Sequence, residues 1–156
     1  MRKLVGTFAL CCGLIPGSAA VAATQNVIFN GTIAATCVLV VNANGTMTVS
    51  TDLQSLSSHN AGGSAGTVTL TTTGGVNISV DPVTVVSAPP ADATPTTWSP
   101  TYATSGVHTF AEGGASHALP TPGVDIVTVH LAGTKSGANA FTQGNYQAQV
   151  TVRCEP

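Results

Sequence analysis

The sequence predicts an all-β fold, and three features of the chain lead to this prediction. Apolar and polar residues alternate strictly over the C-terminal segment 144–154, a period typical of a strand with one buried and one exposed face. Other short runs of β-branched residues are separated by turn residues, which are plentiful because the chain has 17 glycines and 9 prolines. Helical patterns are nearly absent. We therefore expect a β-sandwich or barrel of about seven strands in one domain.

Residues 1–23 have the pattern of a secretory signal peptide. Arg2 and Lys3 supply the positive start, Leu4–Ile15 is a short apolar stretch, and small residues precede a cleavage site before Thr24. The apolar stretch is too short for a membrane-spanning helix, and no later run approaches the necessary length. The chain is therefore predicted to be exported without a membrane span.

The charge of the remaining chain argues against a nucleic-acid partner. The whole sequence has four basic and six acidic residues, and removing the signal peptide leaves only Lys135 and Arg153 as basic side chains. Two separated cations cannot neutralise a run of phosphates.

Signal removal also leaves two cysteines, Cys37 and Cys154. Because an exported protein passes through an oxidising compartment, we expect these two to form a disulfide. Closing a loop of this length contributes about 4–5 kcal/mol in the chain-entropy description. The bond would join the beginning of the fold to its end.

The first strand region covers residues 27–41. Its odd-numbered positions form a long apolar face, and beyond Cys37 both faces are apolar. This pattern predicts an exposed or edge strand that runs into a buried one. Asn44–Gly45 then predicts a tight hairpin turn, with residues 46–49 as the returning strand.

The middle of the chain alternates between strand and loop patterns. Two strands, or one bent strand, are predicted around Gly74–Gly75. The other predicted strands are 83–86, 107–110, 124–131 and the final segment, and the predicted loops are 52–66, the proline-rich 89–100, 112–123 and 133–144.

No motif predicts catalysis, a cofactor or a metal site. Gly62–Gly66 matches the G-x-S-x-G pattern, but a loop precedes it and no helix follows, so the nucleophile-elbow interpretation is unsupported. The histidines are at none of the usual ligand spacings, although two of them, His108 and His117, could meet across a hairpin. The chain is therefore predicted not to be an enzyme. Tyr146 is interpreted as a core residue at the start of the last strand, with contact to a ligand as the alternative.

Both ends of the mature chain resemble a known family. Residues 27–33 leading to Cys37, and residues 143–152, are similar to the first segment and last strand of chaperone–usher pilus subunits. The archaic branch, which includes spore coat protein U-like domains, is the most similar. Residues 68–80 resemble that family's second strand. Two features differ: Thr72 and Thr73 stand where family members commonly carry the second cysteine, and Cys154 lies where an aromatic residue is usual.

The resemblance implies an immunoglobulin-like, pilin-type sandwich that lacks one strand, in residues 37–156. It implies that residues 24–36 are a donor strand that completes a neighbouring subunit, with a periplasmic chaperone and an outer-membrane usher as assembly partners and a cell-surface fimbrium as the destination. The implied donor positions are Val27, Phe29, Gly31 and Ile33. The implied acceptor edge is Tyr146, Ala148, Val150 and Val152.

The alternative is a self-contained secreted binding module, such as an adhesin or a carbohydrate-binding sandwich. In that case residues 24–36 would pair within their own chain. Trp98 and Tyr102, expected in the long loop, would be the candidate stacking residues for a ligand.

Overall fold

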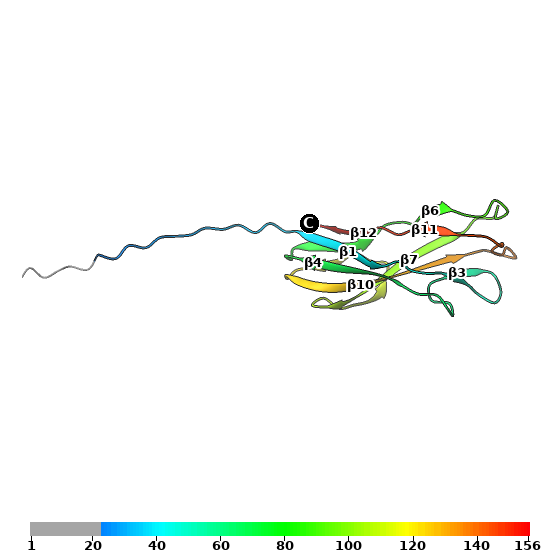
Figure 1. Cartoon of the computed structure of the whole chain (residues 1–156), viewed down its shortest axis with the longest axis horizontal. Coiled ribbons are helices and arrows are strands. Elements are labelled where there is room, and N and C mark those ends of the chain that lie inside the picture. Colours follow the sequence, from blue (N-terminus) through cyan, green and yellow to red (C-terminus); the bar gives the residue numbers. More distant parts are fainter. Residues whose placement is uncertain (1–22) are drawn as a thin grey trace, which may run out of the picture. The chain divides into compact units, whose positions relative to one another are not determined.

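The structure is a computed structural model that describes residues 23–156, apart from the side chains of Val85 and Val86. It confirms the all-β prediction, since this part of the chain contains antiparallel strands and no helix (Figure 1). No segment of residues 23–156 is therefore a helix long and apolar enough to cross a membrane. Its strands are β1 (Cys37–Ala43), β2 (Thr48–Val49), β3 (Ser55–Ser57), β4 (Gly66–Thr72), β5 (Val76–Val80), β6 (Thr84–Ser87), β7 (Thr97–Gly106), β8 (Phe110–Gly113), β9 (His117–Leu119), β10 (Gly123–Thr134), β11 (Gln147–Gln149) and β12 (Val152–Glu155).

The largest sheet is organised around β10, its longest strand. One edge of β10 pairs with β4 over Gly123–Val129 and then with β3 over Ala132–Thr134. The other edge pairs with β7 along ten residues. β1 extends this sheet beyond β4, β8 extends it beyond β7, and β2 extends it beyond β3.

The remaining strands form two small antiparallel sheets, β12-β5-β9 and β11-β6. The core contains side chains from both sides of the fold: Val68 and Leu70 of β4 and Val127 of β10 cluster with Val76 and Ile78 of β5. Because each strand points alternate side chains to opposite faces, this shared cluster means that the large sheet packs face to face against the β12-β5-β9 sheet. The arrangement is consistent with a β-sandwich.

Gly74–Gly75 marks the point where the chain leaves one sheet for the other. β4 belongs to the large sheet and β5 to the β12-β5-β9 sheet. Both glycines have positive φ, 84° and 73°, and a Cβ on Gly74 would lie 2.8 Å from the carbonyl oxygen of Pro120. A side chain is therefore excluded by both conformation and space. Of the two predictions for residues 67–80, the one with two strands is correct.

The predicted hairpin at Asn44–Gly45 is wrong. β2 pairs with β3, while the segment between β1 and β2 bridges through Thr46 to Ser64, in the segment just before β4. Gly45 does not have the positive φ that a two-residue hairpin requires, and a Cβ there would lie 2.9 Å from the backbone nitrogen of Gly66. Close approach to another strand, rather than turn geometry, accounts for this glycine.

Tyr102 provides a test of the packing between the sheets. Only 1% of this β7 residue is exposed, and its hydroxyl donates toward the carbonyl oxygens of Ile78 and Ala115, at 3.0 and 2.7 Å. Tyr102→Phe keeps the ring but leaves buried carbonyls without their donor, so we expect the free energy of unfolding to fall by about 1–3 kcal/mol. Urea denaturation followed by circular dichroism measures the change. An unaltered midpoint would show that this hydroxyl does not link the two sides of the fold.

Candidate functional site

The candidate site is a groove with β1 on one side and the last strands, β11 and β12, on the other, each with one free edge. Within residues 23–156, β1 pairs only with β4, β12 only with β5 and β11 only with β6. One side of each strand therefore presents backbone amide and carbonyl groups that no other strand within residues 23–156 occupies. Such edges are templates for pairing with another strand.

The groove has a volume of about 400 Å³. One wall is formed by the end of β1 and the following residues, Val41 to Met47, and the other by Gln147 to Val152. Its floor includes Val68 of β4 and Leu131 of β10, which belong to the large sheet. A second hollow of about 370 Å³ continues it past Tyr146, sharing Met47 and Ala148 with the first. The groove thus leads from the surface to the edge of the core.

The last strand directs its apolar side chains inward, as its alternation predicts. Tyr146, Ala148, Val150 and Val152 are half-buried and line one or other hollow, whereas the intervening Gln147, Gln149 and Thr151 are exposed. The strand is interrupted at Val150–Thr151, where it passes from β6 to β5 as its partner. The backbone N–H of Asp81 donates to the carbonyl of Thr151 at this break.

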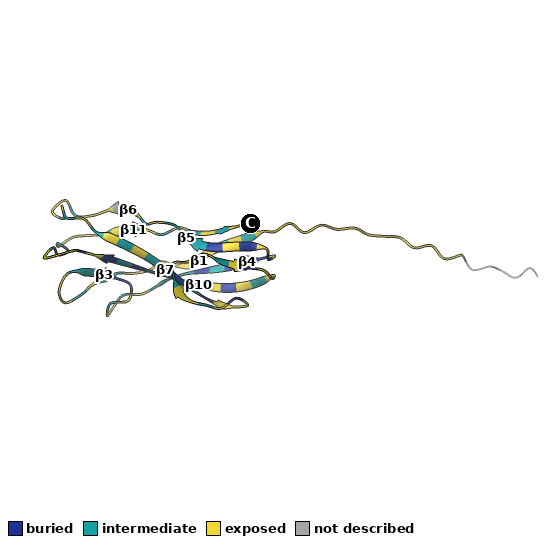
Figure 2. Cartoon of the chain, turned by 180° about the vertical axis from the view of Figure 1, so that it is seen from behind, coloured by how far each residue is buried: buried dark blue, intermediate teal, exposed yellow. Residues whose placement is uncertain are grey.

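The four implied donor positions are exposed. Residues 23–36 contain no strand, and Figure 2 shows them as exposed throughout. Phe29 is 91% and Ile33 85% exposed, and Val27 is similarly open. A Cβ on Gly31 would meet nothing within 4 Å. The chain divides into two units after Gly31, namely Met1–Gly31 and Thr32–Pro156. The predicted signal peptide lies, except for Ala23, outside the described residues.

Residues just before β1 continue its pairing. The backbone N–H of Thr36 donates to the Thr73 hydroxyl at 2.8 Å, and the Thr73 N–H donates to the carbonyl of Thr36 at 3.1 Å. The Thr73 hydroxyl also lies 3.0 Å from the carbonyl of Ala34. These bonds hold the chain extended as it enters β1.

The predicted disulfide is confirmed. Cys37 at the start of β1 is bonded to Cys154 in β12, with the two Cα atoms 6.2 Å apart. Because β1 and β12 do not pair with each other, this bond directly links the two strands whose neighbouring residues, Val41 and Val152, line the groove.

A buried ionic network lies beside Tyr146, which lines the second hollow. The Lys135 ammonium donates to an Asp92 oxygen at 2.6 Å and to the carbonyl of Thr94 at 2.7 Å, and both charged side chains are almost fully buried. The Tyr146 hydroxyl donates to the second Asp92 oxygen at 2.7 Å. Burial acts to raise the pKa of Asp92, but the hydrogen bonds from Lys135, Tyr146 and Thr94 outweigh it, and the pKa lies below its ordinary value. Tyr146 is therefore held by this network at its hydroxyl.

Trp98 and Tyr102, the candidate stacking residues of the binding-module alternative, do not lie in a loop as that alternative expects. Both lie in β7 rather than in a loop. Tyr102 is buried in the core, so it cannot stack on a ligand. Trp98 is half-buried against Gly133 of β10, where a Cβ would lie 2.5 Å from its ring. The prolines in residues 89–100 predicted a loop, but its last residues begin strand β7. The pairing of β7 with β10 determines which of its side chains point inward.

The histidines are also arranged differently from the hairpin pair considered above. His108 is buried, with Nδ1 2.7 Å from an Asp125 carboxylate oxygen, while His117 stacks on Phe110. The histidines that do meet are His59 and His130, whose rings stack with centroids 3.8 Å apart.

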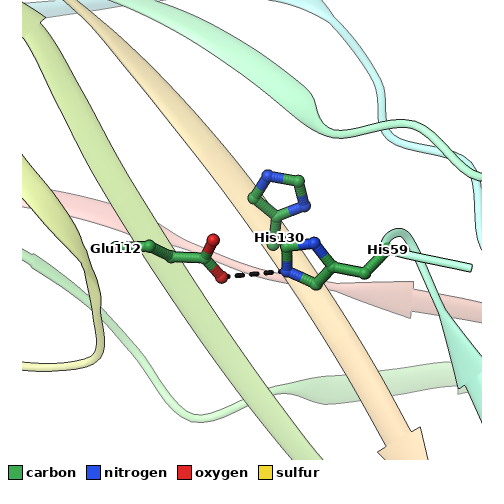
Figure 3. A group of neighbouring side chains, drawn as sticks. All are labelled: His59, Glu112 and His130. Atoms are coloured by element: carbon green, nitrogen blue, oxygen red, sulfur yellow. Dashed lines mark hydrogen bonds and ion pairs between the residues drawn. The ribbon is translucent and has the colours of Figure 1, made fainter.

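Glu112 completes this group, as Figure 3 shows. Its carboxylate lies 2.9 Å from His59 Nε2, and the potential ligand atoms of the three side chains are all within 4.8 Å of one another. The three residues come from the loop after β3, from β8 and from β10, so no spacing in the sequence predicts their meeting. Only the register of the strands brings them together.

Comparison with known proteins adds no relative. No protein-family model, no curated protein and no solved structure matches the chain.

Proposed function

We propose that the chain is an exported structural subunit of a bacterial surface fibre or coat, in which one copy's residues 24–36 complete the groove of the next. The observation that carries the proposal is the combination of an exposed, alternating apolar segment with an apolar groove between two unpaired edges. A strand inserted there would hydrogen-bond to both walls and place alternate side chains on the floor.

The segment and the groove have compatible dimensions. At about 3.3 Å per residue, the groove wall from Tyr146 to Val152 spans about 20 Å, and the apolar pattern from Val27 to Ala35 about 26 Å. Burying Val27, Phe29 and Ile33 contributes on the order of 5–9 kcal/mol as an upper estimate. Backbone pairing along both edges adds to this. The exchanged strand would then be held for a long time.

The occupant comes from a neighbouring copy because of the way the chain enters β1. To reach the free edge of β1 in its own molecule, the segment would have to reverse direction just before Cys37. The hydrogen bonds between Thr36 and Thr73 instead keep this entry extended. Before a neighbour arrives, the groove needs a temporary occupant, and the resemblance to chaperone–usher subunits points to a periplasmic chaperone strand, with an outer-membrane usher at the site of exchange.

The test uses the mature chain, residues 24–156, and pairs of adjacent substitutions. Phe29→Asp places a charge on the inserted face, whereas its matched control Ile28→Asp places the same charge on the opposite face of the same exposed segment. We expect the unaltered chain and Ile28→Asp to form oligomers that survive about 2 M urea, and Phe29→Asp to remain monomeric. Sedimentation velocity measures the distribution.

The same comparison applies to the acceptor side. Val150→Asp changes a groove wall, and its control Thr151→Asp changes the neighbouring exposed position, which does not line the groove. Val150→Asp should abolish the oligomers, and combining it with either donor-segment variant should not restore them. A mature chain that is a stable monomer, or oligomers lost equally in both members of a pair, would refute the proposal.

A further inference from the structure

We propose that His59, Glu112 and His130 form a binding site for a divalent transition-metal ion, for which Zn²⁺ is the probe. Two imidazoles and one carboxylate make up a donor set typical of zinc and of its neighbours in the first row, and they leave coordination positions for water. All three ligands belong to one copy of the chain, so the site is complete without strand exchange, although His130 also lines the groove.

The sheet positions two of the three ligands. His130 of β10 lies opposite Thr101 of β7, and both point away from the core, on the face opposite Val129 and Leu131. The Thr101 hydroxyl donates to Glu112 Oε1 at 2.5 Å. Glu112 is thereby held beside the histidines by a residue of the paired strand. Such a second partner for a ligating carboxylate is common around metal sites.

His130 is oriented in the same manner. Its Nδ1 lies 3.0 Å from the hydroxyl of Ser58, which is itself fixed because it accepts the backbone N–H of Leu131 at 3.1 Å. With Nδ1 occupied by this bond, Nε2 is the nitrogen available to a metal. Fixing one ring nitrogen so that the other ligates is the usual role of a partner behind a histidine ligand.

Binding requires a small rearrangement of His59. A metal lies in the plane of each imidazole that binds it, so rings stacked 12° from parallel must turn apart to share one ion. Ligand atoms around tetrahedral zinc lie about 3.4 Å apart, given bonds of about 2.1 Å. The atoms here need to approach by little more than 1 Å, and His59, half exposed in a loop, is free to turn. Bonds to the ion then take the place of the stacking between His59 and His130 and of the contact between His59 and Glu112.

The experiment is isothermal titration of metal-free mature chain with ZnCl₂ at pH 7.5. The variants are His59→Gln, Glu112→Gln and His130→Gln, and the control is His117→Gln, the histidine stacked on Phe110. We expect one ion per chain, with affinity reduced more than about tenfold in the three variants and unchanged in the control. With Cu²⁺ instead, the electron paramagnetic resonance spectrum should show two nitrogen ligands in the unaltered chain and one in His59→Gln.

Two outcomes would overturn the proposal. One is the absence of binding by the unaltered chain at millimolar Zn²⁺. The other is binding that His59→Gln leaves unchanged, which would place the ion elsewhere; because His59 is exposed, this variant tests the site without disturbing the core.

Discussion

Replacing both cysteines, with Cys37→Ser and Cys154→Ser together, is expected to lower the free energy of unfolding by about 4–5 kcal/mol. The bond closes a loop with a sequence separation of 117 residues, so removing it greatly enlarges the conformational freedom of the unfolded chain. It also joins β1 to β12, two strands that do not pair with each other. Its loss therefore removes the covalent connection between the walls of the groove as well as a constraint on the unfolded state.

Urea denaturation of the oxidised chain and of the double variant measures this effect. The unaltered chain in reducing agent is the control and should unfold at the midpoint of the variant. If strand exchange is as proposed, the variant should also lose oligomers more readily on dilution, because its groove walls are less firmly held. A double variant with the stability of the oxidised chain would mean that the bond contributes nothing beyond the packing around it.

Lys135→Met is expected to cost about 3–5 kcal/mol of stability. The ammonium is fully buried beside Asp92 and lies 4.9 Å from the centre of the Phe141 ring, so the substitution leaves a buried carboxylate without its counter-ion. Tyr146 donates to the same carboxylate, and its position at the end of the groove depends on it. Thermal unfolding followed by circular dichroism measures the loss.

The matched control is Arg153→Met. Arg153 forms ion pairs of the same length with Asp81 and Glu155, but at the surface, where water replaces the lost partner, so a much smaller change is expected. Removing both buried charges, with Lys135→Met and Asp92→Leu, should recover part of the loss. Equal destabilisation by Lys135→Met and Arg153→Met would contradict the importance of burial.

The same network gives a dependence on pH. The pKa of Asp92 is depressed in the folded chain, so its contribution to stability is complete above the pKa of the unfolded chain and is lost as the pH falls through the folded value. Below about pH 4 we expect the free energy of unfolding to fall more steeply with decreasing pH in the unaltered chain than in the double variant Lys135→Met, Asp92→Leu.

Several features could be predicted from local pattern alone. Strict alternation in residues 145–154 identified a strand and its inward side chains, and β-branched runs between glycines and prolines identified an all-β chain. The disulfide followed from counting cysteines after the predicted signal peptide. In each case the necessary information lies in neighbouring residues or in composition, because strand periodicity and export chemistry do not depend on which segments meet.

Other features depended on the meeting of distant segments. The Asn44–Gly45 pair has the composition of a hairpin turn, yet its glycine is required by the approach of Gly66. Tyr102 follows a proline-rich stretch, yet it enters the core because β7 pairs with β10. Lys135 and Asp92 are 43 residues apart in sequence, and nothing near either one indicates burial.

The sequence by itself therefore determined that this protein is made of strands, which faces of the terminal strands are apolar, and which cysteines are joined. Only the tertiary structure decided that β1 and the last strands have no second partner strand in the described part of the chain and lie on either side of a groove, and that His59, Glu112 and His130 share one surface. Alternation is a property of one strand, whereas a free edge or a ligand cluster is a property of several strands. Their order and register are set by packing across the whole core.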